Sequence, residues 1–148
     1  MTTHSPVIKR LRKHKVSPAD FTIRRASDTD IERIYALIMS AEGRLLKRSR
    51  ADIRKSIKFF FVAELESMVV ACCALEIYNK KLAEVRSLVV APEWQNQGIA
   101  SAILTRCVDE AKRRRVYEVL AITDSEGVFR RQGFSEQLQG QKALFLRP

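Results

Sequence analysis

The sequence predicts one α/β domain with a mixed, mostly antiparallel central sheet and about four flanking helices. Three observations predict this class: two amphipathic helical patterns near the start, three short apolar runs separated by tight turns, and a helical pattern followed by another apolar run. The last helix and the runs on either side of it form a β-α-β unit, whose two strands must be parallel. At 148 residues, 46% of them hydrophobic, the chain is long enough for one core and too short for two.

The first elements are predicted from their caps and apolar faces. Ser27 and Ser49 each stand three residues before an aspartate, which is the spacing of a capping box with Asp in the Glu position. The first helix has one apolar face, formed by Ile31, Ile34, Leu37 and Ile38. The predicted elements are a strand at 21–27, a helix from Ser27, a basic loop or broken helix at 41–48, and a helix at 49–57.

The later elements are predicted from a change in the spacing of the apolar residues. Short apolar runs replace the helical pattern and indicate three antiparallel strands, at 59–64, 68–78 and 82–90. A helix from Ser101, a strand at 117–123 and a short helix at 126–132 follow. One or two last strands are predicted within 133–148.

The formal charge of +10 is unevenly distributed, because residues 1–17 carry five cations and no acid. This segment is expected to be a basic, flexible arm that precedes a domain at 18–148. A basic arm raises the alternative of a nucleic-acid-binding module. No DNA- or RNA-reading motif accompanies the arm, which disfavours nucleic acid as the partner.

The cysteines and the apolar runs indicate where in the cell the protein is located. Cys72, Cys73 and Cys107 lack metal-ligand spacing and are expected to be buried, reduced thiols. No apolar run approaches the roughly 20 residues of a membrane span, and the N-terminus lacks a secretory h-region. We therefore expect a soluble, cytoplasmic protein without membrane partners.

The stretch "VVAPEWQNQGIASAIL", residues 89–104, joins a strand to a helix through a loop with one glycine. Backbone N–H groups at the start of a helix lack intrahelical partners and, with the helix dipole, favour an anion such as phosphate. Gly98 permits close approach of a ligand to the backbone, and Ala100 keeps the next position small. Neither common nucleotide motif, G-x-x-x-x-G-K-[ST] or G-x-G-x-x-G, is present.

Gln95-x-x-Gly98-x-Ala100 resembles the [Q/R]-x-x-G-x-[G/A] motif of the GCN5-related N-acetyltransferase (GNAT) superfamily, and "FRRQGF" at 129–134 is also similar. The resemblance covers about residues 20–140. It implies a single-domain GNAT fold with a splayed parallel strand pair, acetyl-CoA as co-substrate and no metal. The implied cofactor contacts are the strand residues Leu88, Val89 and Val90, and the loop and helix-start residues Gln95, Asn96, Gln97, Gly98, Ile99, Ala100 and Ser101.

Acetyl transfer to an amine needs a group that removes a proton from the nucleophile. Glu84 lies eleven residues before Gln95, where similar acetyltransferases carry a glutamate base. The alternative is that Glu84 forms an ordinary ion pair with Arg86. The family often uses a tyrosine to protonate the departing thiolate, but Phe129 stands at that place; Tyr78 and Tyr117 are interpreted as packing or strand-edge residues, so no general acid is assigned.

The chain is also similar to the acetyltransferase domain of bacterial N-acetylglutamate synthases, which implies amino-acid acetylation and arginine biosynthesis. By this resemblance the carboxylates of glutamate would meet Lys47, Arg48, Ser49 and Arg86. The acidic segment "DSEG", 124–127, departs from those synthases and favours the alternative of a cationic amine, either a polyamine or a protein amino group. The amino-acid-kinase domain of the longer synthases is not in the sequence, so feedback by arginine through it is not expected. Whether the protein forms a homodimer is left open.

Overall fold

The computed structural model describes residues 17, 20–41 and 47–148, and the helices and strands in this part of the chain confirm the predicted α/β class. One five-stranded sheet runs in the order β1-β2-β3-β4-β5. Neighbouring strands are antiparallel except for the parallel pair β4 and β5. The strands are β1 Thr22–Arg25, β2 Phe60–Leu65, β3 Met68–Ile77, β4 Leu82–Val90 and β5 Glu118–Ala121.

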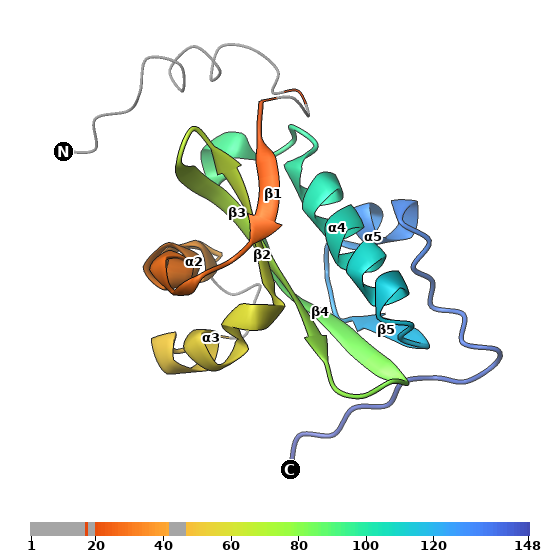
Figure 1. Cartoon of the computed structure of the whole chain (residues 1–148). Helices are drawn as coiled ribbons and strands as arrows, with labels where there is room; N and C mark the ends of the chain where they lie inside the picture. The colour runs from red at the N-terminus through yellow and green to blue at the C-terminus, as the bar shows by residue number, and fades with distance from the viewer. Residues whose placement is uncertain (1–16, 18–19, 42–46) are drawn as a thin grey trace.

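Helices cover both faces of the sheet. Figure 1 shows α2 and α3 on one side of the sheet and α4 and α5 on the other. The helices are α2 Ile31–Ser40, α3 Arg50–Ser56, α4 Ile99–Arg113 and α5 Glu126–Arg131, with 3-10 turns at Asp28–Asp30, Ile57–Phe59 and Pro92–Trp94. None of the described helices is long and apolar enough to cross a membrane.

The helix starts follow the predicted caps with small shifts. The Ser27 N–H donates to Asp30 Oδ2 (2.8 Å), and Ser49 Oγ accepts from the Asp52 N–H (3.1 Å), so both capping signals are used. A 3-10 turn intervenes before α2, and α4 begins two residues earlier than predicted, directly after Gly98.

The core lies between the sheet and its two helix layers. Strands β2 and β3 are buried along most of their length, and the predicted apolar face of α2 is fully buried. All three cysteines are buried free thiols, as expected. Burial raises the pKa of the Cys72 thiol to about 12, which keeps it protonated and unreactive.

An irregularity in β4 separates the strand into two parts. The β3–β4 register shifts between Cys72 and Ala74, and Ser87 has a φ of 56°, so β4 carries an extra residue there. Side chains alternate between half-buried and buried as far as Leu88, but Val89 and Val90 are both buried. The parallel pairing with β5 ends at Val85, so β5 separates from β4 before the bulge.

The prediction of one or two last strands within 133–148 is wrong. The structure contains there only an isolated bridge between Leu138 and Gln141. Leu144, Phe145 and Leu146 are 90%, 72% and 86% exposed, so this apolar run is not part of the core that the described residues form. The predicted arm, residues 1–17, lies almost entirely outside the described residues, and so does most of the predicted basic loop.

Candidate active site

A cleft of 420 Å³ opens where β5 separates from β4. One wall is the stretch of β4 from Glu84 to Val90, together with Gln95 and Asn96 from the following loop. The other wall comes from the chain after β5 and from α5. Its residues are Ile122, Thr123, Asp124, Ser125, Val128 and Phe129, and Ala41 closes one end.

Glu84 lines this cleft in the first half of β4 and is held by a neutral donor. The Tyr78 hydroxyl donates to Glu84 Oε2 over 2.5 Å, and no ion pair involves Glu84 within the described residues. Burial and the Glu84 carboxylate raise the pKa of Tyr78 to about 12. The alternative of a Glu84–Arg86 ion pair is therefore not what the structure contains.

Arg86 instead pairs with Glu76 across the hairpin. Arg86 Nη1 donates to Glu76 Oε2 (2.8 Å), and Arg48 Nη2 donates to Glu76 Oε1 (2.7 Å). Glu76 and Glu84 are direct cross-strand partners, and like charges in such positions repel. In the structure, Glu76 accepts hydrogen bonds from two guanidinium groups, whereas Glu84 accepts one from a hydroxyl. Within the described part of the chain, Glu84 is thus the carboxylate of the two that forms no ion pair.

The pKa of Glu76 reflects this competition. Burial, the largest single influence, raises the pKa, but the hydrogen bonds and charges of Arg86 and Arg48 together hold it below its usual range. Glu76 is therefore ionised at neutral pH and fixes the side chain of Arg86. Arg86 lines the cleft with 28% of its side chain exposed.

The four predicted carboxylate-binding residues lie in four different environments. Arg48 is buried and also donates to Ser56 Oγ (3.0 Å), and its guanidinium lies over the Phe60 ring, so it supports Glu76 and does not line the cleft. Ser49 acts as the N-cap of α3. Lys47 is exposed. Of the four predicted residues, Arg86 alone lines the cleft.

The second half of β4 offers main-chain groups to the cleft. The Ala91 N–H donates to the Val70 carbonyl on β3 (2.8 Å). Successive residues of a strand face opposite sides, so the Val90 N–H and carbonyl point away from β3, toward the space that β5 has left. The Val90 carbonyl accepts from the Gln95 side-chain amide (3.1 Å), which ties the loop to the strand.

The loop then turns sharply into α4. Asn96 and Gly98 both have left-handed backbones, with φ of 60° and 83°, and Gly98 is the N-cap of the helix. The first helical bond is from Ala102 N–H to the Gly98 carbonyl (3.1 Å), so the earlier amides have no partner within the helix. No acidic side chain lies in the first turn to neutralise the dipole. Among the predicted cofactor residues, those lining the cleft are Leu88, Val89, Val90, Gln95 and Asn96; Gln97, Gly98, Ile99, Ala100 and Ser101 continue directly from them.

The residues that sequence reasoning missed are Tyr78 and Glu76. Tyr78 was interpreted as a packing residue, and Glu76 was not singled out. A signal was present, because Glu76 lies on β3 and Tyr78 directly follows that strand, in the short connection that leads to Glu84 and Arg86 on β4. The described residues contain no group of three or more His, Cys, Asp or Glu side chains that could hold a metal ion.

Comparison with known families gives one model match, to the acetyltransferase (GNAT) domain, over residues 56–136. An uncharacterized N-acetyltransferase of Chlorobaculum tepidum is 37% identical over 120 residues, covering 80% of this chain and 77% of the relative. An amino-acid acetyltransferase of Mycobacterium tuberculosis is 31% identical over 118 residues, covering 77% and 68%.

Solved structures agree with these sequence matches. A Mycobacterium tuberculosis protein in complex with CoA and NLQ has a TM-score of 0.74 and 30% identity, covering 77% of this chain and 71% of that one. The N-acetylglutamate synthase of Neisseria gonorrhoeae, complexed with coenzyme A and N-acetyl-glutamate, has a TM-score of 0.71 and 27% identity. The match covers 80% of this chain but only 28% of the synthase, so the similarity is to one part of that longer protein.

Proposed function

This chain belongs to the acetyltransferase (GNAT) family, and we propose that it acetylates the α-amino group of a small amino acid that carries a second carboxylate, such as glutamate. The coarser activity is that of an acetyl-CoA-dependent N-acetyltransferase of GNAT type. The observation that carries the finer proposal is the pair on β4, Glu84 and Arg86: among the described residues, a carboxylate that forms no ion pair and a guanidinium fixed by Glu76 line the same cleft.

Acetyl-CoA would lie along the second half of β4 and across the start of α4. The pantetheine arm is a chain of amides that pairs with backbone groups, and the Val90 N–H faces the cleft without a strand partner on that side. The pyrophosphate would meet the amides from Gly98 to Ser101, where the helix dipole favours negative charge. Together these groups would place the thioester between β4 and β5.

Glu84 would accept the proton of the substrate ammonium, directly or through a water molecule. The neutral amine attacks the thioester carbonyl and the C–N bond forms. The C–S bond then breaks, the thiolate leaves, and the nitrogen releases its extra proton to solvent. The hydroxyl of Tyr78 holds the Glu84 carboxylate in one orientation during this proton transfer. No tyrosine lines the cleft near Phe129, so protonation of the thiolate is assigned to solvent.

Arg86 would bind a carboxylate of the acceptor. One of its nitrogens is occupied by Glu76, which fixes the guanidinium plane, and the rest of the exposed group faces the cleft. The names of the amino-acid acetyltransferase relatives and the N-acetyl-glutamate bound by the Neisseria synthase support the same substrate class. The place in arginine biosynthesis that the resemblance implies remains a prediction.

A cationic amine is the second candidate. Asp124 lines the opposite wall of the cleft and is exposed, so it would attract a polyamine or a protein amino group. The two candidates predict opposite charge preferences for the acceptor.

A substrate panel tests the proposal. CoA thiol release from acetyl-CoA is measured with glutamate, glutamine, aspartate, a diamine and a lysine-containing peptide. The proposal predicts the highest kcat/KM for an amino acid with a side-chain carboxylate, above that for glutamine. Turnover confined to the diamine or the peptide would favour the second candidate.

A further inference from the structure

Arg48 is the only buried cation among the described residues, with 6% of its side chain exposed. Its guanidinium lies over the Phe60 ring, 5.3 Å from the ring centroid, and donates hydrogen bonds to three different segments of the chain. The acceptors are Glu76 Oε1 on β3 (2.7 Å), Ser56 Oγ at the end of α3 (3.0 Å) and Ser87 Oγ on β4 (3.4 Å). A charge is tolerated in such a position only where partners replace the water that it has lost. Arg48 therefore connects segments that line or support the cleft without entering the cleft itself.

The contact with Glu76 determines how much positive charge Arg86 offers to the cleft. Glu76 is shared, because Arg48 occupies its Oε1 atom and Arg86 occupies its Oε2 atom. Two guanidinium groups and one carboxylate leave one positive charge in excess, and Arg86 is the member of this group that lines the cleft. Without Arg48, Glu76 and Arg86 would form a neutral pair. A substrate carboxylate would then meet a guanidinium whose charge is already balanced, so its attraction would be weaker.

The contact with Ser87 lies at the bulge of β4. Ser87 has a left-handed backbone, with a φ of 56°, which is an unfavourable conformation for a residue with a Cβ atom. Residues in such conformations persist where surrounding contacts hold them in place. Two contacts do so here: the Cys72 thiol donates to the Ser87 carbonyl (3.4 Å), and Arg48 Nη1 donates to the Ser87 hydroxyl (3.4 Å). The direction in which residues 88–90 leave the bulge depends on this backbone conformation.

We propose that Arg48 is a positioning residue for both substrates of the reaction. Through Glu76, it keeps Arg86 available to a carboxylate of the acceptor. Through Ser87, it holds the bulge that orients the cofactor segment of β4, residues 88–90. This inference rests on the function proposed above. Loss of Arg48 should therefore weaken the binding of both substrates, whereas a variant in one part of the cleft should weaken the binding of one.

Arg48→Met tests the proposal, because methionine is an unbranched side chain that fills part of the space and removes the charge and the donors. Calorimetry measures the dissociation constant of acetyl-CoA without an acceptor, and steady-state turnover measures KM for glutamate. Both constants should rise about tenfold, since each site loses a hydrogen bond from a charged group that supports it. The midpoint of thermal unfolding is recorded for every variant, so that both constants are measured where the protein is folded.

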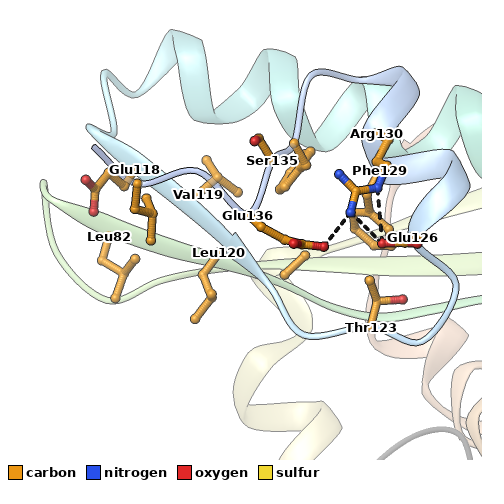
Figure 2. A pocket seen from close by; sticks show the side chains of 13 residues that line it. Leu82, Glu118, Val119, Leu120, Thr123, Glu126, Phe129, Arg130, Ser135 and Glu136 are labelled. Carbon is orange, nitrogen blue, oxygen red and sulfur yellow. Dashed lines mark hydrogen bonds and ion pairs between the residues drawn. The ribbon is translucent and has the colours of Figure 1, made fainter. Parts of the chain in front are cut away.

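Arg130→Met is the matched control. Arg130 also pairs with carboxylates, those of Glu126 and Glu136, and Figure 2 shows these two ion pairs at one end of a groove of 270 Å³. The Arg130 side chain is 47% exposed and does not line the cleft. The same substitution there removes an arginine and its ion pairs outside the active site, so neither constant should change.

Ser87→Gly, added to Arg48→Met, separates the two contacts. Glycine adopts a positive φ without the cost that a Cβ atom adds, so the bulge no longer needs its contact with Arg48. The double variant should recover most of the lost acetyl-CoA affinity. Its KM for glutamate should stay raised, because Glu76 still neutralises Arg86. A general loss of stability would not be corrected for one substrate alone.

Arg48→Lys is the conservative variant. Lysine keeps a cation beside Glu76 but lacks the planar set of nitrogens that reaches Ser87 at the same time. KM for glutamate should stay close to the parent value, and the acetyl-CoA dissociation constant should rise as in Arg48→Met. This variant decides the outcome if Arg48→Met does not fold.

A folded Arg48→Met protein in which either constant equals the parent value overturns the proposal. An equal loss of affinity in Arg130→Met, or no recovery of acetyl-CoA affinity with Ser87→Gly, overturns it as well. Turnover of the parent confined to a diamine contradicts the proposed function instead. Because acetyl-CoA affinity is measured without an acceptor, the role of the contact with Ser87 is still decided by that measurement.

Discussion

Residues 82–85 of β4 have a strand on each side, whereas residues 88–90, beyond the bulge at Ser87, have only β3 beside them. Glu84 in the first part and Arg86 directly after it present charged side chains to the cleft, held by Tyr78 and Glu76 respectively. The second part presents main-chain groups, and its side chains Val89 and Val90 are buried. The two parts of β4 thus offer different groups to the cleft. Where β5 pairs with β4 the side chains are offered, and where β5 has separated the main-chain groups are offered as well. Chemistry and substrate choice should depend on side chains in the first part, and cofactor binding on backbone conformation in the second.

The largest effect is expected from Glu84→Gln, which keeps the shape of the side chain and removes its proton acceptor. Loss of a general base typically lowers the rate about 10²- to 10⁴-fold. The dissociation constant of acetyl-CoA should stay unchanged, because the second part of β4 is untouched. Stopped-flow turnover and calorimetric binding measure the two quantities. Turnover equal to that of the parent would remove Glu84 from the mechanism.

Arg86→Ala should act on the acceptor alone. A hydrogen bond to a charged group is worth about 1.5–3 kcal/mol, so KM for glutamate should rise about 10- to 100-fold. Arg86→Lys keeps the charge but loses the planar donor, so its KM for glutamate should lie between those of the parent and of Arg86→Ala. KM for a diamine serves as the control and should not rise. Equal KM values for glutamate in the parent and in Arg86→Ala would place the carboxylate site elsewhere.

Gly98→Val tests the second part of the comparison. An added Cβ at Gly98 meets no protein atom within 4 Å, but the φ of +83° is strained for a β-branched residue, at about 1–2 kcal/mol. We expect the acetyl-CoA dissociation constant to rise about tenfold. Gly133→Val is the matched control, since Gly133 has a φ of +94°, equally open space and no place in the cleft. If both variants weaken binding alike, the loop is not the cofactor site.

The smallest effect is expected from Tyr78→Phe. The hydroxyl makes one hydrogen bond to Glu84, and a neutral bond of this kind contributes about 0.5–1.5 kcal/mol, so kcat should fall about two- to tenfold. Turnover at saturating substrate measures this effect, and the midpoint of thermal unfolding is the control. A merely structural role would lower that midpoint and leave the kcat of the folded protein unchanged.

Local sequence signals predicted the second part of β4 and the loop better than the first. Gln95, Gly98 and the strand before them form one continuous stretch, and in the structure residues 88–90 and Gln95 line one cleft while Gly98 begins α4. The partners of Glu84 and Arg86 depend on the register of the β3–β4 hairpin, which is set where the Asn79 side chain accepts from the N–H groups of Lys81 and Leu82. That register is a property of two strands together. The alternation of one strand alone could not distinguish Glu76 from Glu84 as the partner of Arg86.

Two other differences between the predicted and the observed structure also depend on contacts between segments that are distant in sequence. Arg48 stands in a basic sequence that is typical of a surface loop, yet it is buried, because Glu76 and two serines accept its donors. The strands expected after α5 contain suitable apolar residues, but a strand needs an edge to pair with. Within the described residues that segment pairs only at the isolated bridge between Leu138 and Gln141, so its alternation predicted a strand that is not formed.

The most direct measurement of the central claim is a competition experiment in which acetyl-CoA, glutamate and a diamine are present together and the acetylated products are separated by mass spectrometry. The parent enzyme should produce mainly N-acetylglutamate, and Arg86→Ala should lose that preference while Glu84→Gln loses both products. Acetylation of the diamine alone by the parent, with glutamate unchanged, would contradict the assignment of Arg86 as the carboxylate site and of an amino acid as the substrate.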